Sequence, residues 1–294
     1  MTIRLAGAPI SWGVCEVEGW GHQLEPDRVL TEMRDAGLAA TELGPDGFLP
    51  SDPHELTETL ARYDLTAVGG FVPVLLHDPN HDAVAAVGGA LDALVASKSD
   101  VIVLAAVTGA VGYDSRPELD GAGWKTLLRN LDRLSSAAAD RGLRAVIHPH
   151  VGTMIENRAE VDRILDGSSI PLCLDTGHLL IGGTDPLDLV TSAPERIAHA
   201  HLKDVDAALL DRVRAGELTY TAAVAQGMYT SLGTGDVDIA GVVGRLQNQG
   251  YDGWYVLEQD TILEQDTILE SEPEDEGPVR DVVRSVEYLK SIAK

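Results

Sequence analysis

VIVLAA, residues 101–106, is an unbroken apolar run, and RAVIH at 144–148 and WYVLE at 254–258 are nearly so. Such runs are typical of parallel strands, because helices cover both faces of a parallel sheet. From these stretches outward, strand-like runs alternate with amphipathic helical stretches eight times. Eight repeats predict one closed barrel of eight parallel strands, a (β/α)8 TIM barrel of the α/β class. A doubly wound sheet is the alternative, but it needs a glycine-rich turn after its first strand, where this chain has APISW at 8–12.

The expected elements cover most of the chain. Strands are expected at 3–8, 39–43, 66–74, 101–106, 144–148, 172–175, 197–203 and 253–258. Helices are expected at 26–36, 53–63, 81–97, 122–141, 158–166, 186–192, 239–248 and 279–292. The longest irregular stretch is 204–238, where LGTGDVD at 232–238 is expected to turn into the next helix. Because no linker rich in Pro, Ser or Gly divides the chain, residues 1–294 are expected to form a single TIM-barrel domain.

Composition and charge exclude several classes of partner. The 294 residues carry a formal charge of −25, which repels the phosphates of nucleic acids and anionic membrane surfaces. No stretch of about 18 uninterrupted apolar residues and no signal-peptide pattern occurs, so a cytoplasmic protein without a membrane partner is expected. Cys15 and Cys173 are too few for a disulfide framework. The sequence leaves the oligomeric state open, a homo-oligomer included.

A six-residue duplication stands near the end of the chain. LEQDTI occupies 257–262 and again 263–268. Because WYVL leads directly into the first copy, Glu258 is assigned to the strand end and the second copy to the following loop. The stretch from Glu258 to Asp281, both ends included, contains ten acidic residues and one arginine, so the loop at about 257–278 is expected to be a solvated connection.

Polar residues gather where the expected strands end, which is where parallel barrels build their active sites. Five of the nine histidines lie on three successive strand ends, next to carboxylates. The cluster comprises His148 and His150 after strand five, Asp175 and His178 after strand six, His199, His201 and Lys203 on strand seven, and Glu258 on strand eight. Imidazole and carboxylate groups together bind divalent metals such as Mn²⁺, Co²⁺, Zn²⁺ or Mg²⁺. The cluster therefore predicts a metal site.

Strand alternation sorts these residues by depth. His199, His201 and Lys203 share one face of their strand, so that His201 and Lys203 reach the mouth and His199 lies one layer deeper. Asp175 follows three apolar residues, and a carboxylate there is costly to desolvate without a cation. Asp175, His201 and Glu258 are therefore expected to be metal ligands. Early in the chain, a wall for a small polyol ring is expected from Trp12, Glu42 and Phe71.

Several motifs together resemble a known family. APISWG, TELG, HPHVGTMIE, LCLDTGH, AHLKD, LGTGDVD and WYVLEQD resemble the xylose-isomerase-like barrel superfamily and, through HPHVGT and EQD, its inosose dehydratase branch. The resemblance implies a divalent metal held by a Glu on strand five, an Asp on strand six, a His on strand seven and a Glu on strand eight. The last three correspond to Asp175, His201 and Glu258. At the first position the chain has His148, the expected fourth ligand, with Glu156 as the alternative.

The expected reaction begins with the removal of a proton from the carbon next to a carbonyl group. A metal with open positions can bind a ketone oxygen and the neighbouring hydroxyl, which stabilises an enediolate. Loss of a β-hydroxyl then gives dehydration, and reprotonation gives isomerisation or epimerisation. His150, Glu156, His178 and Lys203 are the candidate catalytic groups. The resemblance implies dehydration of 2-keto-myo-inositol; the alternatives are an isomerase or epimerase of a ketose with the same metal, and a non-catalytic sugar-binding protein.

Overall fold

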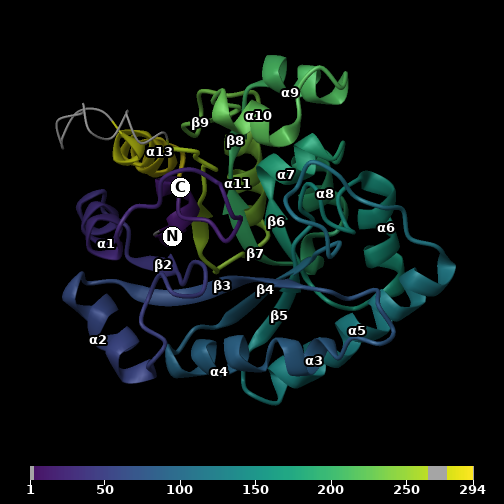
Figure 1. The fold of residues 1–294 in the computed structure, drawn as a ribbon. Coiled ribbons are helices and arrows are strands. Elements are labelled where there is room, and N and C mark those ends of the chain that lie inside the picture. Colours follow the sequence, from purple (N-terminus) through teal and green to yellow (C-terminus); the bar gives the residue numbers. More distant parts are fainter. Residues whose placement is uncertain (1–2, 264–276, 294) are drawn as a thin grey trace.

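Eight parallel strands close into a barrel in the computed structural model, which describes residues 3–263 and 277–293 (Figure 1). Around the barrel the strands follow the order β1-β10-β7-β6-β5-β4-β3-β2. Their bounds are β1 Leu5–Gly7, β2 Ala40–Glu42, β3 Thr66–Val74, β4 Val101–Ala106, β5 Arg144–Ile147, β6 Leu172–Asp175, β7 Ile197–Leu202 and β10 Tyr255–Leu257. Each strand lies within the run expected from the sequence, so the (β/α)8 fold is confirmed.

Helices cover the outside of the barrel. Those between and after the strands are α1 Pro26–Asp35, α2 Pro53–Arg62, α3 Ala83–Ala86, α4 Gly88–Ala96, α5 Gly121–Ala139, α6 Arg158–Gly167, α8 Pro186–Ser192, α11 Ile239–Asn248 and α13 Pro278–Ile292. The expected single helix at 81–97 is wrong, because the chain breaks at Val87 between α3 and α4. Gly88 and Gly89 follow the break, and glycine is a poor helix former. Three short elements were not expected, namely η1 (Pro9–Trp12), α7 (Thr176–Ile181) and η2 (Pro194–Arg196).

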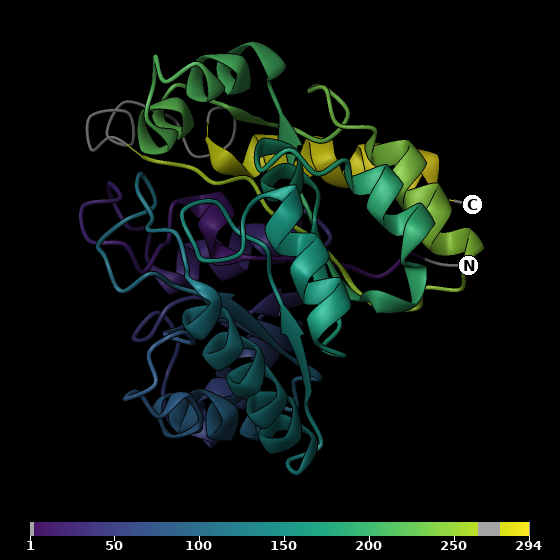
Figure 2. The same ribbon diagram turned by 90° about the vertical axis from the view of Figure 1, so that its right-hand side faces the viewer.

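The stretch 204–238 is more regular than expected. It contains a two-stranded antiparallel ribbon, β8 (Asp204–Val205) with β9 (Tyr229–Thr230), and the helices α9 (Ala207–Arg214) and α10 (Tyr220–Ala225). Both helices are short, and each begins at a residue whose side chain caps the first turn. Neither is long enough to show the apolar periodicity by which a helix is recognised in a sequence. The turn expected at 232–238 is present and leads into α11. Figure 2 shows α9 and α10 on the opposite side of the molecule from the end of α13.

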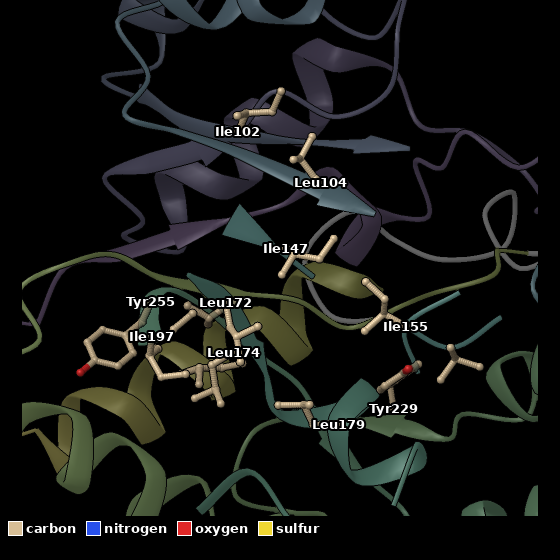
Figure 3. Close-up of a cluster of buried hydrophobic side chains, with 14 of the residues drawn as sticks. Ile102, Leu104, Ile147, Ile155, Leu172, Leu174, Leu179, Ile197, Tyr229 and Tyr255 are labelled. Atoms are coloured by element: carbon tan, nitrogen blue, oxygen red, sulfur yellow. The ribbon is translucent and has the colours of Figure 1, made fainter. Parts of the chain in front are cut away.

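Two kinds of apolar core hold the barrel. The larger lies between strands and helices, and part of it is drawn in Figure 3, including Ile102, Leu104 and Leu172. The smaller clusters comprise Ala6, Ala8, Ala40, Val68 and Val256, and Val101, Val103, Val146 and Cys173. Because successive strand residues point to opposite faces, Val101 and Val103 face the lumen while Ile102 and Leu104 face the helices.

This alternation decides which polar residues reach the mouth of the barrel. Asp175 lies two residues after Cys173, and His148 lies two residues after Val146, so both continue the lumen-facing rows. Glu258 directly follows β10, which confirms its assignment to the strand end. Apart from Leu263, the second LEQDTI copy lies outside the described residues, as does most of the acidic loop at 257–278. Within the described ranges, none of the helices is long and apolar enough to cross a membrane.

Candidate metal centre and active site

Four side chains meet at the carboxyl ends of adjoining strands. His148 Nε2 lies 3.3 Å from Asp175 Oδ2. His201 Nδ1 lies 3.8 Å from the same oxygen and 3.3 Å from Glu258 Oε2. Among the described residues, His148 Nε2, Asp175 Oδ2 and His201 Nδ1 are buried without a hydrogen-bond partner. Unpartnered buried polar atoms are rare, so three of them converging on one point fit a site for a bound cation.

Glu42 orients the imidazole of His201. Its Oε1 accepts hydrogen bonds from His199 Nε2 at 2.8 Å and His201 Nε2 at 2.9 Å. A carboxylate can only accept, so Nε2 of His201 carries the hydrogen and Nδ1 is left to bind a cation. Glu42 was expected to contact substrate. It lines the cavity, but its Oε1 accepts hydrogen bonds from the two histidines. His199 lies in the deeper layer, as expected.

The groups around His201 favour its protonated form. Burial lowers the pKa of the His201 imidazole, but its interactions with the Cys173 thiol and with the carboxylates of Glu258 and Glu42 raise it by more, to well above its ordinary value. For Glu258, burial acts to raise the pKa, yet the charges of His201 and Lys203 hold it below the ordinary range. A divalent metal would take the place of the proton on Nδ1.

The Lys203 ammonium group is surrounded by three carboxylates. Its Nζ lies 2.5 Å from Glu258 Oε2, 2.9 Å from Asp260 Oδ1 and 3.2 Å from Asp175 Oδ2. Burial alone would lower the pKa of this amine, but the three negative charges raise it well above its ordinary value. Lys203 is therefore an ammonium ion at neutral pH, although its side chain is only 2% exposed.

His150 and His178 are neutral imidazoles close to the Lys203 ammonium and its carboxylates. Burial lowers the pKa of both well below the ordinary histidine value, helped by neighbouring positive charges. Their rings stack at a centroid distance of 3.7 Å. His150 Nδ1 lies 2.7 Å from the carbonyl oxygen of Val151. Because a carbonyl only accepts, Nδ1 carries the hydrogen and Nε2 of His150 keeps a lone pair that can take a proton.

A cavity of about 650 Å³ opens onto this cluster. His148, His150, Lys203 and Glu258 line its polar end, and Phe71 packs against the two histidine rings at 5.9 and 5.6 Å between centroids. Phe71 thus lies where the sequence placed it, in the wall of the cavity.

Two residues expected in the site lie away from it. Trp12 is fully buried and donates its indole hydrogen to Glu32 of α1, while Trp20 lines the cavity instead. Glu156 lies 3.1 Å from Arg116 Nε and accepts from the amide of Gly152. The cavity wall does not include Glu156, so the structure does not bring this carboxylate to the metal ligands.

Sequence reasoning missed three buried residues of the cluster, Asp260, Tyr220 and Tyr229. Asp260 lies two residues after Glu258, so extending the strand alternation by one step would have found it. Tyr220 donates a hydrogen bond to Asp260 Oδ2 at 2.8 Å. Tyr220 and Tyr229 come from the segment between β7 and α11, where no periodic pattern pointed to the site.

Comparison with known proteins places these observations in context. Residues 30–291 match the family model described as xylose isomerase-like TIM barrel. The chain is 33% identical over 271 residues to the inosose dehydratase of Lacticaseibacillus casei, covering 88% of this chain and 90% of that protein. It is 31% identical over 270 residues to the inosose dehydratase of Geobacillus kaustophilus strain HTA426, covering 87% of each. A solved L-ribulose 3-epimerase shares the fold, with a TM-score of 0.71, 15% identity and coverage of 99% of this chain and 94% of that one.

Removing a ligand is expected to remove metal. In Asp175→Asn or His201→Ala, metal retained after dialysis against Mn²⁺, measured by mass spectrometry of the purified protein, should fall well below one ion per chain, because each change deletes a donor atom. His199→Gln is the matched control. His199 lies on the same face of β7, but among the described residues its side chain hydrogen-bonds to Glu42 alone, so the variant should keep wild-type metal content. Full occupancy in both ligand variants would rule out this site.

Proposed function

The chain belongs to the xylose isomerase-like TIM barrel family, and on this premise we propose that it removes water from 2-keto-myo-inositol (inosose) with a divalent metal bound at the barrel mouth. It is an enzyme of the hydro-lyase class, as are the inosose dehydratases to which it is related along most of its length. The observation that carries the proposal is the convergence of imidazole and carboxylate donors at the mouth of the cavity. The non-catalytic sugar-binding alternative is therefore set aside.

The donor set suits a divalent metal. His148, Asp175, His201 and Glu258 would hold it, two imidazoles and two carboxylates, a mixture that favours Mn²⁺ or Co²⁺ and is also compatible with Zn²⁺ or Mg²⁺. When bound, the metal would supply Lewis acidity to a ketone oxygen and an adjacent hydroxyl. Glu156 is not retained as the alternative fourth ligand, since Arg116 and the Gly152 amide hold its carboxylate elsewhere.

The charge of the cavity favours a neutral polyol over a phosphorylated sugar. Among the described residues, its lining includes Glu16, Glu42, Asp46, Glu258 and Asp260, and Lys203 contributes the one ammonium group. A phosphate group would add negative charge beside these carboxylates, and the described part of the lining contains no arginine to bind it. A ring that carries only hydroxyl groups and one ketone avoids this repulsion and can hydrogen-bond to the same carboxylates.

The residues around the cavity supply the proton transfers. His150 Nε2 takes the proton from the carbon next to the ketone, since this nitrogen is unprotonated at neutral pH. Lys203 lines the cavity, and its ammonium group would donate a hydrogen bond to the oxygen on which negative charge develops. The imidazolium of His150 returns its proton to the departing β-hydroxyl. One water leaves, no proton is gained or lost overall, and the resulting enol tautomerises to a dione.

The central test is product analysis. The purified chain with Mn²⁺ is expected to convert 2-keto-myo-inositol to a trihydroxycyclohexane-dione, followed by ultraviolet absorbance of the conjugated product, and chelation should abolish the conversion. Proton NMR in D₂O separates dehydration from isomerisation or epimerisation. Deuterium incorporation into a product that keeps all its oxygens, with no dione formed, would establish the isomerase alternative instead.

Two substitutions after β5 separate the candidate bases. His150→Gln is expected to lower kcat by about 10²–10⁴-fold while metal binding persists, because a general base is lost without a ligand. Glu156→Gln is the matched control in the same loop, and it should retain most of the turnover because its carboxylate contacts Arg116 outside the cavity. The opposite ranking in steady-state kinetics would make Glu156 the proton-transfer group.

A further inference from the structure

The cavity at the barrel mouth continues beyond the proposed metal ligands, past one edge of β3. Its wall includes four successive residues of this strand, Gly70 to Pro73. Phe71 faces the lumen, where it packs against the cluster that contains Val101, whereas Gly70 faces outward to Leu94 of α4. Because both faces of β3 line one cavity, the cavity passes around an edge of the strand.

That edge is open because β2 ends early. β3 pairs with β2 as far as Gly69, whereas its pairing with β4 continues to Val74. In the described part of the chain, residues 70–74 therefore have no partner in β2. Pro73 lacks an amide hydrogen, and proline within a sheet is confined to edges of this kind. At this edge the lumen connects with the space next to the helices α2 and α4, which pack on β3 (Figure 1).

This outer part of the cavity, the side chamber, has a wall that is apolar except at its rim. It is lined by residues of the β2–α2 connection and of both helices, namely Leu43, Leu49, Pro50, Leu56, Ala93 and Leu94. Its polar lining residues, Asp46 and Ser51, are exposed and form the rim. A wall of this composition gains free energy when another apolar group covers it, and offers little to a hydroxyl or a phosphate.

The cavity is also larger than an unsubstituted polyol ring requires. Its volume of about 650 Å³ lies in the range, about 300–1,000 Å³, of pockets that hold drug-sized ligands. A keto-polyol ring bound at the polar end, next to His150 and Lys203, would leave the side chamber unfilled. The proposed dehydration changes the ketone carbon, the α-carbon and the β-carbon. The ring carbon opposite the ketone takes no part and is free to carry a substituent.

We propose that the side chamber is a subsite for an apolar substituent, and that the enzyme acts on keto-polyols with an alkyl or aryl ether on the carbon opposite the ketone. The polyol ring occupies the polar end, and the ether group passes the edge of β3 between Leu43 and Leu94, the side chains that flank Gly70. This substrate class rests on the proposed dehydration. The binding of an apolar group in the side chamber does not.

Binding is tested without turnover. The probe is 5-O-benzyl-myo-inositol, which has no ketone and cannot react, and myo-inositol is its reference. Calorimetry of the purified full chain with Mn²⁺ should give a Kd about 10–100-fold lower for the benzyl ether, the scale expected when an aromatic ring is buried. Equal affinities, or no binding of the benzyl ether, would overturn the inference.

Glycines along the side chamber locate the subsite. A Cβ added at Gly88 or Gly89 meets no atom within 4 Å, so both positions have room for leucine, but only Gly89 is among the described lining residues. Gly89→Leu should therefore remove most of the preference for the benzyl ether, and Gly88→Leu, the matched control, should keep it. At Gly70 a methyl group would lie 3.6 Å from Leu94 Cδ2 and 3.7 Å from Leu43 Cβ, so Gly70→Ala narrows the passage without a clash and should also weaken the preference. An unchanged preference in both Gly89→Leu and Gly70→Ala would overturn the location.

Turnover separates this inference from the proposed function. With 2-keto-myo-inositol and its 5-O-benzyl ether as substrates, kcat/KM should favour the ether by about 10–100-fold, because binding energy of a remote group raises kcat/KM. Dehydration of inosose with an inert ether would overturn the proposed substrate class. Absence of turnover with both compounds would refute the proposed function, while calorimetry would still decide whether the subsite exists.

Discussion

Buried carboxylates at the mouth of the barrel outnumber the positive charges that face them. Glu42, Asp175, Glu258 and Asp260 are all buried, and within the described part of the chain Lys203 is the ammonium group that contacts the last three. Moving one ion from water into a protein interior costs several kcal/mol, so each of these charges needs compensation. A proton on the nearby imidazole supplies part of it, and a divalent cation supplies more. The orientation that Glu42 imposes on His201 and the three carboxylates around Lys203 both follow from this constraint.

The fold was predictable because its strands are buried on both faces. Val101 to Ala106 and Leu172 to Leu174 are apolar at every position, which distinguishes barrel strands from half-exposed ones. The break at Val87 and the short helices α9 and α10 were not predictable in the same way. Their formation depends on single caps and glycines, which leave little periodic signal.

Most of the proposed metal ligands follow from strand ends, because a strand fixes the direction of each side chain. His148, Asp175 and His201 come together as the alternation predicts. Loop residues have no such constraint, so contacts from other segments decided the positions of Trp12 and Glu156. In both cases the side chain binds a residue that is distant in the sequence. No local sequence pattern indicates such a partner.

Two buried tyrosines next to the site show a further limit of the sequence prediction. Tyr220 and Tyr229 are nine residues apart and lie on a helix and a ribbon strand that only the folded chain places over the barrel mouth. Their importance comes from hydrogen bonds to Asp260 and His178, which belong to two other segments. Contacts between such distant segments are visible only once the tertiary structure is known.

The central claim, that these buried carboxylates and imidazoles form a divalent metal site, is tested most directly by diffraction. An anomalous difference map from a crystal of the full chain grown with Mn²⁺ should show one strong peak coordinated by His148 Nε2, Asp175 Oδ2, His201 Nδ1 and Glu258, with the Lys203 ammonium beside it but not bound to it. A crystal that contains Mn²⁺ yet shows no peak among these four side chains, or that places the ion on Glu156, would contradict the account.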